Sequence, residues 1–310
     1  MTPSALFRLG TRGSPLALAQ ANEARRRLAE AHGWVIEQIA LQVIRTSGDK
    51  IQDRPLAEAG GKGLFTKEID AALLVGAIDA AVHSAKDLPS LVPDGVVIGA
   101  CLPREDVRDA LVSALADSIE ALPRGATFGA ASLRRQAQAL RLRPDLKPAL
   151  LRGNVETRLA KAESGAVGAT LLALAGLRRL GLAHRARAVL DADKFLPAPG
   201  QGAIAITARS ADARTLAALE PISDAETMAA LAAERAFLAE LEGSCRTPIA
   251  GLARLEAGRL RFRGEVLRPD GSERFDIAAE GAAADAERLG REAGRDLKAR
   301  LPEGVLVRGE

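Results

Sequence analysis

The sequence predicts an α/β fold of two doubly wound lobes, hinged around a cleft, and a small C-terminal α+β domain. Three observations support this prediction. Apolar strand-like segments alternate with amphipathic helical segments over about the first two hundred residues, as they do in doubly wound parallel sheets. The alternation starts again after Leu102. Near the C-terminus, three strand-like segments follow one another without an intervening helix, which is typical of a separate α+β unit.

The first lobe begins with a strand and a clearly marked helix. Ser14 precedes Pro15, and this pair is a favourable N-cap followed by proline at the first helical position. The helix is predicted to stop at His32 and Gly33, because glycine commonly ends helices. Strands are predicted at residues 6–10, 35–45, 78–82, 96–101 and 204–208, and helices at residues 15–31 and 65–75.

The second lobe and the last domain are predicted from the same patterns. The stretch PAPGQG at residues 197–202 predicts a hinge, and the strand after it is predicted to complete the first sheet. The second lobe is predicted to contain strands at residues 125–131, 148–151 and 169–174 and helices at residues 133–141 and 155–161. The last domain is predicted to contain helices at residues 224–241 and 282–300 and strands at residues 248–253, 260–267 and 273–279, with a hairpin turn at residues 269–271. The predicted domains are residues 1–102 with 203–220, residues 103–199, and residues 223–310.

The composition is that of a globular protein with more than one domain. The 310 residues are too many for one ordinary core, and 47% apolar with 27% charged residues excludes disorder. A net charge of +3 gives no reason to expect a nucleic-acid partner, and no apolar run predicts a membrane span. Residues 1–10 lack an apolar signal core, and Cys101 and Cys245 form no C-x-x-C pair. We therefore expect a cytoplasmic protein with neither a disulfide framework nor a metal site.

The glycine-rich stretch at residues 60–63 does not match a nucleotide-binding loop. Leu56 and Gly63 stand where a phosphate-binding loop needs glycine and a hydroxyl residue. Thr66 stands where a dinucleotide-binding loop needs its third glycine. A nucleotide-dependent enzyme is therefore disfavoured.

Six short polar segments are predicted to meet in the cleft. Most of them follow a predicted strand, and ligands of doubly wound sheets bind at the carboxyl ends of the strands. The segments are TRGSPLA (11–17), RTSGD (45–49), GGKGLF (60–65), VHSAKDLP (82–89), ASLRRQ (131–136) and LRGNVETR (151–158).

The side chains of these segments favour an anionic ligand. Arginine offers a planar fork of donors that holds a carboxylate at two points, and Ser132 stands at a predicted helix start, which also favours anions. The constellation predicts a ligand with several carboxylates, although any one arginine could be a solvated surface charge. The cations are Arg12, Lys86, Arg134, Arg135, Arg152 and Arg158, and the hydrogen-bond donors are Ser14, Ser132 and Asn154.

Two further residues allow a chemical and a structural interpretation. Asp87 follows Lys86 at the end of an apolar strand and could stabilise a developing cation or move a proton; it could also be a helix cap or an ion-pair partner of Lys86. Cys245 lies in LEGSCRTPIAG beside Arg246, and a neighbouring cation can activate a thiol. An inert, half-buried thiol is the alternative.

Ten segments, in order along the chain, resemble the hydroxymethylbilane synthase (porphobilinogen deaminase) family. The resemblance runs from about Arg8 to Gly251, and the rest of the chain resembles the family in size and pattern only. The segments are RLGTRGSPLALAQA, RTSGDK, GGKGLFTKEID, DAAVHSAKDLPS, LPREDVRDALVS, ASLRRQAQ, LRGNVETRL, LAGLRRLG, PAPGQGAIAI and LEGSCRTPIAG.

The resemblance implies a fold and an activity. It implies two lobes like those of periplasmic binding proteins and a third domain that carries the cysteine. It implies the condensation of four porphobilinogen molecules into hydroxymethylbilane, with release of ammonia, by a monomer. The reaction uses a dipyrromethane cofactor as a primer, which a thioether joins to the cysteine at the position of Cys245.

The resemblance also implies roles for individual residues. Asp87 matches the catalytic aspartate, which would stabilise the azafulvene-like cation left when ammonia departs. Lys62 and Phe65 match a loop near the cleft that would act as a lid. Cofactor-binding positions match Lys86, Asp87, Ser132, Arg134 and Arg135, and substrate-binding positions match Arg12, Ser14, Arg152, Arg158 and Arg179.

The chain departs from the family pattern at a few positions. Glu58 replaces a lysine common before GGKG, and Ala130 and Ala131 replace hydroxyl residues common before SLRR. Two alternatives to the synthase are a two-lobed anion receptor without chemistry and a cysteine hydrolase with a free Cys245. The receptor leaves Cys245 without a role, and the hydrolase predicts that a thiol alkylator captures it.

Overall fold

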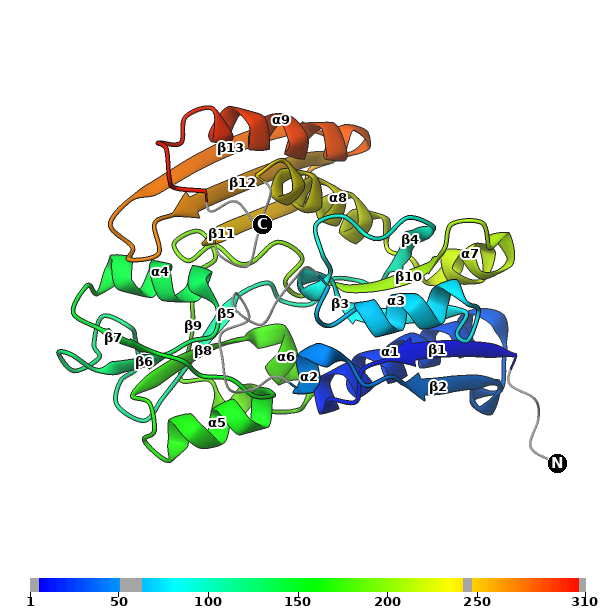
Figure 1. Cartoon of the computed structure of the whole chain (residues 1–310), viewed down its shortest axis with the longest axis horizontal. Coiled ribbons are helices and arrows are strands. Elements are labelled where there is room, and N and C mark those ends of the chain that lie inside the picture. The colour runs from blue at the N-terminus through cyan, green and yellow to red at the C-terminus, as the bar shows by residue number, and fades with distance from the viewer. Residues whose placement is uncertain (1–5, 51–62, 242–246, 307–310) are drawn as a thin grey trace.

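The computed structural model describes residues 6–50, 63–241 and 247–306, and only the backbone of residues 49 and 50. Two α/β lobes lie side by side, and a third domain lies across both of them (Figure 1). Each lobe contains a five-stranded sheet, and the third domain contains a three-stranded sheet. The predicted fold class is confirmed. The residue limits of the three domains stay a prediction.

The first lobe is built on the strand order β2-β1-β3-β10-β4. The strands β1, β2 and β3 run parallel, and β10 pairs antiparallel with both β3 and β4. The strands are β1 (Phe7–Thr11), β2 (Ile39–Val43), β3 (Ala80–Ser84), β4 (Val96–Cys101) and β10 (Ile204–Arg209). The helices are α1 (Pro15–His32), η1 (Ile36–Gln38), α2 (Ser47–Lys50), α3 (Lys67–Leu74), η2 (Ala85–Asp87), α7 (Ala213–Leu219) and η4 (Glu220–Ile222).

The helix α1 begins and ends where the sequence predicted. Ser14 Oγ accepts a hydrogen bond from the backbone N–H of Ala17, and Gly33 ends the helix with φ of 62°. Its apolar face packs in the core of the first sheet, where Leu28 and Leu9 are fully buried. The prediction of one long strand over residues 35–45 was wrong, because residues 36–38 form a 3₁₀ turn before β2 begins.

The second lobe repeats this arrangement with the order β7-β6-β8-β5-β9. Again three strands run parallel, and β5 pairs antiparallel with β8 and β9. The strands are β5 (Asp109–Ser113), β6 (Thr127–Gly129), β7 (Lys147–Ala149), β8 (Ala169–Ala173) and β9 (Ala188–Val189). The helices are α4 (Leu133–Leu142), α5 (Val155–Glu163), α6 (Leu174–Arg179) and η3 (Ala183–Arg185).

The antiparallel strand of each sheet follows a crossing between the lobes. The chain crosses at residues 102–108 and enters the second sheet as β5, and it returns at residues 190–203 and enters the first sheet as β10. The sheets are therefore mixed, although the alternation of strands and helices had predicted parallel ones. The prediction that residues 204–208 belong to the first sheet is confirmed, whereas β5 was not predicted.

The two crossings run side by side. The backbone N–H of Glu105 donates to the carbonyl of Gly202, at 3.3 Å. Gly202 has φ of 87°, and a Cβ there would lie 2.3 Å from the carbonyl oxygen of Glu105. Only glycine permits this backbone conformation and this approach, so the predicted hinge sequence serves to hold the two crossings together.

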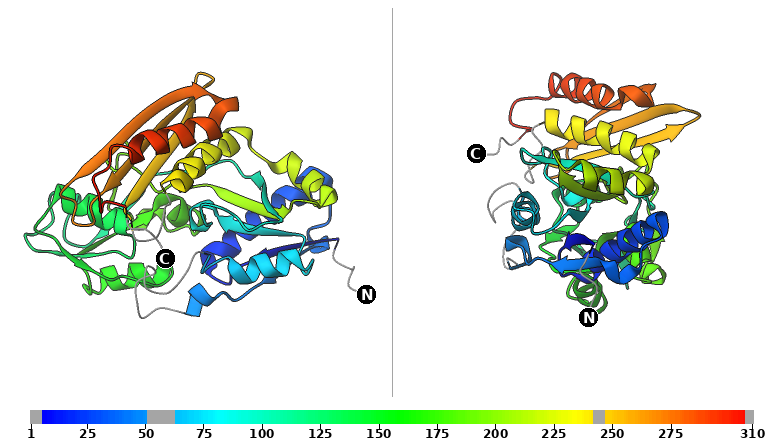
Figure 2. Two further views of the ribbon diagram at one scale, coloured as in Figure 1. Left: turned by 45° about the horizontal axis from the view of Figure 1, so that its top comes forward. Right: turned by 90° about the vertical axis from the view of Figure 1, so that its right-hand side faces the viewer.

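The third domain packs two helices on one face of its sheet (Figure 2). The rings of Phe237 and Phe262 lie 4.8 Å apart in its core. Gly264 gives Phe237 its space, since a Cβ at Gly264 would lie 2.4 Å from the ring. The elements are α8 (Ala225–Glu240), β11 (Ile249–Glu256), β12 (Arg259–Leu267), β13 (Arg274–Ala282), η5 (Ala283–Asp285) and α9 (Ala286–Lys298). Among the described helices, none has the length and apolar character that a membrane crossing requires.

Candidate functional site

The predicted site residues follow the parallel strands of both sheets. Arg12 and Ser14 follow β1, and Lys86 and Asp87 end the 3₁₀ turn after β3. In the second lobe, the segments that begin at Ser132 and Arg152 follow β6 and β7, and α6 follows β8. The strand-end placement that the sequence predicted is therefore present in both lobes.

Asp87 lies beside a cation of its own lobe. Its carboxylate is 3.9 Å from Arg12 Nη1, and 37% of its side chain is exposed. Arg12 also stacks on the ring of Phe65, with Cζ 4.1 Å from the ring centroid. These three residues line a small cavity of about 50 Å³ together with Ser14 and His83. Asp87 thus pairs with Arg12, whereas Lys86, the partner considered from the sequence, donates to Gln201 instead.

A fully buried carboxylate organises the arginines of the second lobe. Asp109 Oδ2 accepts from Arg134 Nη2 at 2.8 Å, and Asp109 Oδ1 accepts from Arg135 Nη2 at 2.7 Å. Gln201 Nε2 donates to the same Oδ1 at 2.9 Å. Burial alone would raise the pKa of Asp109, but the charges of Arg134 and Arg135 outweigh it and hold that pKa well below its ordinary value. The carboxylate is therefore ionised at neutral pH.

The arginines retain donors that Asp109 does not use. Arg134 is 4% exposed, and within the described part of the chain its buried Nε has no hydrogen-bond partner. Burial lowers the pKa of Arg134. One carboxylate thus faces two guanidinium groups, and the cluster has an excess of positive charge that suits an anionic ligand.

Lys86 connects this cluster to the first lobe. Its Nζ donates to Gln201 Oε1 at 3.3 Å, and Gln201 in turn holds Asp109. Partial burial and the positive charge of Arg135 lower the pKa of Lys86 to about 8. Gly200, with φ of 76°, allows the second crossing to pass beside Lys86, since a Cβ there would lie 2.9 Å from the Lys86 backbone nitrogen.

The other predicted cations lie around these groups. Arg158 Nε donates to the carbonyl of Gly153 at 2.9 Å, and burial with the charge of Arg135 lowers the pKa of Arg158 to about 10. Arg152 is 8% exposed. Arg179 lies at the junction of the lobes, where it donates to the carbonyl of Gly202 at 3.0 Å and lies 3.5 Å from a carboxylate oxygen of Glu23 on α1.

The three predicted hydroxyl and amide donors are helix N-caps. Ser14, Ser132 and Asn154 accept from backbone N–H groups at the starts of α1, α4 and α5. Their oxygens therefore satisfy backbone N–H groups at these helix starts, and the hydroxyl hydrogens of the two serines can still be donated to a ligand.

Comparison with known proteins identifies the family. Residues 7–217 match the family model described as porphobilinogen deaminase, dipyromethane cofactor binding domain, and residues 228–299 match the model of the porphobilinogen deaminase C-terminal domain. The chain belongs to the porphobilinogen deaminase family. The porphobilinogen deaminase of Nitrobacter hamburgensis is 59% identical over 96% of this chain and 94% of the relative. That of Paracoccus denitrificans is 54% identical over 97% of this chain and 96% of the relative.

Solved structures of binding proteins are also similar to the chain. The methionine-binding protein MetQ matches 72% of this chain and 91% of its own length, at 14% identity and a TM-score of 0.45. A nutrient-binding protein of Burkholderia cenocepacia bound to methionine matches 69% of this chain and 92% of its own, at 16% identity and a TM-score of 0.42.

The family resemblance stated from the sequence is confirmed, and some residues that it singled out lie outside the described part of the porphobilinogen deaminase chain. These are Cys245, Lys62 and Glu58. Phe65 is described and lies against Arg12. Ala130, one of the departures from the family pattern, packs against the core of the second lobe.

Two residues that build this cluster were not predicted from the sequence. Asp109 begins β5, and Gln201 lies in the hinge sequence. The segment LPREDVRDALVS contained a signal, because an aspartate directly before an apolar run must find partners if the run becomes a buried strand. Nothing in the local sequence named those partners, which are 25 and 26 residues away for Arg134 and Arg135.

The side chains of Cys101 and His83 are not suited to act as a nucleophile or as an acid–base group at neutral pH. Burial raises the pKa of Cys101 to about 12, and burial with the charge of Arg12 lowers the pKa of His83 to about 4. The thiol and the imidazole are therefore both neutral at pH 7.

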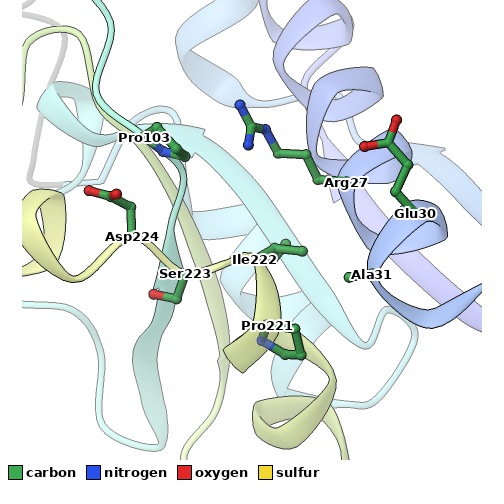
Figure 3. A pocket seen from close by; sticks show the side chains of 8 residues that line it. All are labelled: Arg27, Glu30, Ala31, Pro103, Pro221, Ile222, Ser223 and Asp224. Carbon is green, nitrogen blue, oxygen red and sulfur yellow. The ribbon is translucent and has the colours of Figure 1, made fainter.

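A more open cavity of about 440 Å³ lies between α1 and the segment before α8 (Figure 3), and its lining mixes Arg27 with Glu30 and Asp224. None of the predicted site residues lines it.

Proposed function

We propose that this chain is a hydroxymethylbilane synthase that condenses four porphobilinogen molecules and releases four molecules of ammonia. As a member of the porphobilinogen deaminase family, it is a transferase of tetrapyrrole biosynthesis. We further propose that the reaction is primed by a dipyrromethane cofactor joined to Cys245 by a thioether. The porphobilinogen substrate bears two carboxylates, so each added unit brings two negative charges to the site.

One observation carries this proposal: both lobes direct cations toward a single accessible carboxylate. Asp87 and Arg12 come from the first lobe. From the second lobe, Arg158 is close enough to Asp87 to attract its carboxylate, and Arg135 is close enough to Lys86 to lower the pKa of that amine. A growing chain of carboxylate-bearing pyrroles needs such a set of donors, because guanidinium groups hold carboxylates in a fixed register.

The donor set fits the cofactor that the family model names. Arg134 has a buried Nε without a partner among the described residues, and Asp109 balances only one of the two positive charges beside it. Arg134, Arg135, Lys86 and Ser132 would hold the carboxylates of the primer. When bound, the primer supplies the nucleophilic pyrrole carbon to which the first substrate is joined.

We propose that Asp87 acts on the reacting substrate. Positive charge develops on the pyrrole ring as ammonia leaves, and a nearby carboxylate stabilises it. The same carboxylate can then accept the proton that the new bond displaces. Arg12, stacked on Phe65, is fixed on one side of Asp87. It would bind a substrate carboxylate beside the reacting ring, with Ser14, Arg152, Arg158 and Arg179 as the further substrate-binding residues.

The intact mass of the denatured protein as purified tests the proposal. We expect a mass excess equal to two linked pyrrole units, and we expect Cys245→Ala to lack it. A bare mass that porphobilinogen restores would identify an unloaded enzyme. A bare mass that porphobilinogen leaves unchanged, without turnover, would contradict the proposal and favour a two-lobed anion receptor.

Replacement of Asp87 with asparagine tests the catalytic role. The amide keeps the size and polarity of the side chain but removes the negative charge, so we expect the primer and the fold to persist while turnover nearly stops. A fall in kcat of about 10²–10⁴-fold is the range expected for a lost acid–base or electrostatic group. Wild-type kcat in Asp87→Asn would exclude the role.

A further inference from the structure

A buried chain of hydrogen bonds links the third domain to Arg134. Glu265, on β12, accepts from Gln138 Nε2, and Gln138 Oε1 accepts from Arg134 Nη1 at 2.9 Å. The side chains of Glu265, Gln138 and Arg134 are 6%, 5% and 4% exposed. The contact therefore crosses from the third domain into α4 of the second lobe without passing through solvent.

The neighbours of Gln138 determine which way its amide points. A carboxylate only accepts hydrogen bonds and a guanidinium only donates them. Glu265 thus requires the nitrogen of the amide on its side, which leaves the oxygen for Arg134. The carbonyl of Leu196, in the second crossing, accepts from both Gln138 Nε2 and Arg134 Nη1, at 3.0 and 2.9 Å. The Nη1 side of the guanidinium is therefore held by both Gln138 and the carbonyl of Leu196, which also contact each other.

We propose that Glu265 is a positioning residue that fixes the guanidinium plane of Arg134 through Gln138, and so couples the third domain to the anion-binding site. The inference rests on the proposed function, in which Arg134 holds the primer. Asp109 accepts from Nη2 of the same guanidinium, and Gln138 with Leu196 accepts from Nη1. With both ends held, the Nε of Arg134, which has no partner among the described residues, keeps one direction.

A carboxylate is poorly suited to simple packing at this place. Burial raises the pKa of Glu265. The hydrogen bond from Gln138 and the charge of Arg274, whose Nη1 lies 4.0 Å away, lower that pKa but do not outweigh the burial. Hydrophobic residues of similar volume commonly serve a buried interface at least as well as an ion. An orienting role for the acceptor accounts for its presence, because a leucine would remove one of the two acceptors that hold Gln138 Nε2 and would leave the carbonyl of Leu196 as the other.

Four variants and one control test the proposal: Glu265→Leu, Gln138→Leu, the double variant, Glu265→Gln, and Glu280→Leu as the control. Glu280 lies on β13 of the same sheet and pairs only with exposed arginines among the described residues. The measurements are the fraction of purified chains with the two-pyrrole mass excess, and kcat and KM of the loaded fraction.

We expect Glu265→Leu to lower both the loaded fraction and kcat, the latter about tenfold, as for other residues that orient a binding group. KM should stay within about twofold, since Arg12 and the other substrate-binding residues keep their contacts. Glu265→Gln should restore loading and kcat, because its amide oxygen can accept from Gln138. Glu280→Leu should match the wild type.

The outcomes separate the coupling from the proposed function. If Glu265→Leu loads and turns over like the wild type, the positioning role is excluded. If the double variant shows the product of the two single losses, the residues act independently, because members of one network are not additive. Should Glu265→Leu fail to fold, Gln138→Leu must reproduce the loss and Glu265→Gln must be active. A wild-type chain with neither mass excess nor turnover would instead refute the proposed function.

Discussion

Two buried ion clusters lie at the junctions of this molecule, and they differ in charge balance. In the first, Glu234 accepts two hydrogen bonds from Arg104, at 2.7 and 3.0 Å, and one each from the backbone N–H groups of Gly200 and Ala253. One carboxylate faces one guanidinium. In the second, Asp109 alone faces both Arg134 and Arg135.

This difference in charge balance suggests different roles: the Glu234 cluster holds the domains together, and the Asp109 cluster is suited to bind a ligand. The Glu234 cluster joins both crossings to the third domain, and all of its carboxylate contacts are supplied by the chain itself. The Asp109 cluster has two guanidinium groups around one carboxylate, and the Nε of Arg134 is a buried donor for which the described part of the chain supplies no partner. A buried charge without a counter-charge is costly, so the second cluster is suited to receive an anionic ligand.

The largest expected effect is on stability, from Glu234→Ala. This change leaves Nη1 and Nη2 of Arg104 and two backbone N–H groups without their acceptor, and breaking a buried pair in this way costs about 3–5 kcal/mol. Urea unfolding followed by circular dichroism measures the free energy of unfolding. Glu30→Ala, which breaks the exposed pair with Arg26, is the control and should change it by less than about 0.5 kcal/mol. A change in the free energy of unfolding of less than about 0.5 kcal/mol in Glu234→Ala would contradict the structural role of the Glu234 cluster.

The next effect is on binding, from Arg135→Leu. This variant gives Asp109 a single guanidinium, as Glu234 has, while Gln201 and Arg134 still satisfy the carboxylate. We expect the free energy of unfolding to change by no more than about 1 kcal/mol. Loading with primer, or kcat/KM of the loaded enzyme, should fall about 100-fold, the scale of a lost charge-assisted contact. Intact mass and steady-state kinetics measure both. Wild-type loading and turnover would make Arg135 a structural charge only.

The smallest effect is a pH dependence that arises from Lys86. The pKa of Lys86 in the folded chain is about 8, below its ordinary value of 10.5. The charged amine that attracts the carboxylates of the primer is therefore lost as the pH rises through 8, and the affinity for the primer should fall by at most about tenfold per pH unit. Stability should change in the opposite direction, because between pH 8 and 10.5 only the unfolded chain keeps the proton, so the free energy of unfolding rises with pH.

The fraction of unloaded chain that porphobilinogen converts to the primed form, and urea unfolding, both measured from pH 6.5 to 9.5, check the two directions. Lys86→Arg keeps its charge over this range and should flatten both curves. In Arg135→Leu the alkaline fall should move to higher pH, because Arg135 is one cause of the lowered pKa of Lys86. An unchanged curve in Lys86→Arg would assign the pH dependence to another group.

Much of the fold and of the site could be predicted from local patterns. Ser14 and Gly33 bound α1 as predicted, and strand-end segments of both lobes provide the cations. These features depend on short-range rules: capping, apolar periodicity and the position of polar residues after strands. The resemblance then supplied roles for Asp87 and Cys245 that local chemistry left open, and those roles remain predictions.

The features that the sequence did not reveal depend on contacts between distant segments. The strand β5, DALVS, was not predicted, and it takes its place in the sheet through antiparallel pairing with β8 and β9, which lie much later in the chain. Asp109, Gln201 and Glu265 are unremarkable in their local sequences, and each becomes informative only through partners from another segment of the chain.

The sequence by itself determined the class of fold, the kind of ligand and the family, because local propensity, charge type and motif order are all written in consecutive residues. Only the tertiary structure decided which charges are balanced. The insertion of β5 and β10 into the opposite sheets brings Asp109 beside two arginines and Gln201 beside Lys86. The free energy of a buried charge depends on what surrounds it in space, and that surrounding is assembled from segments far apart in the chain.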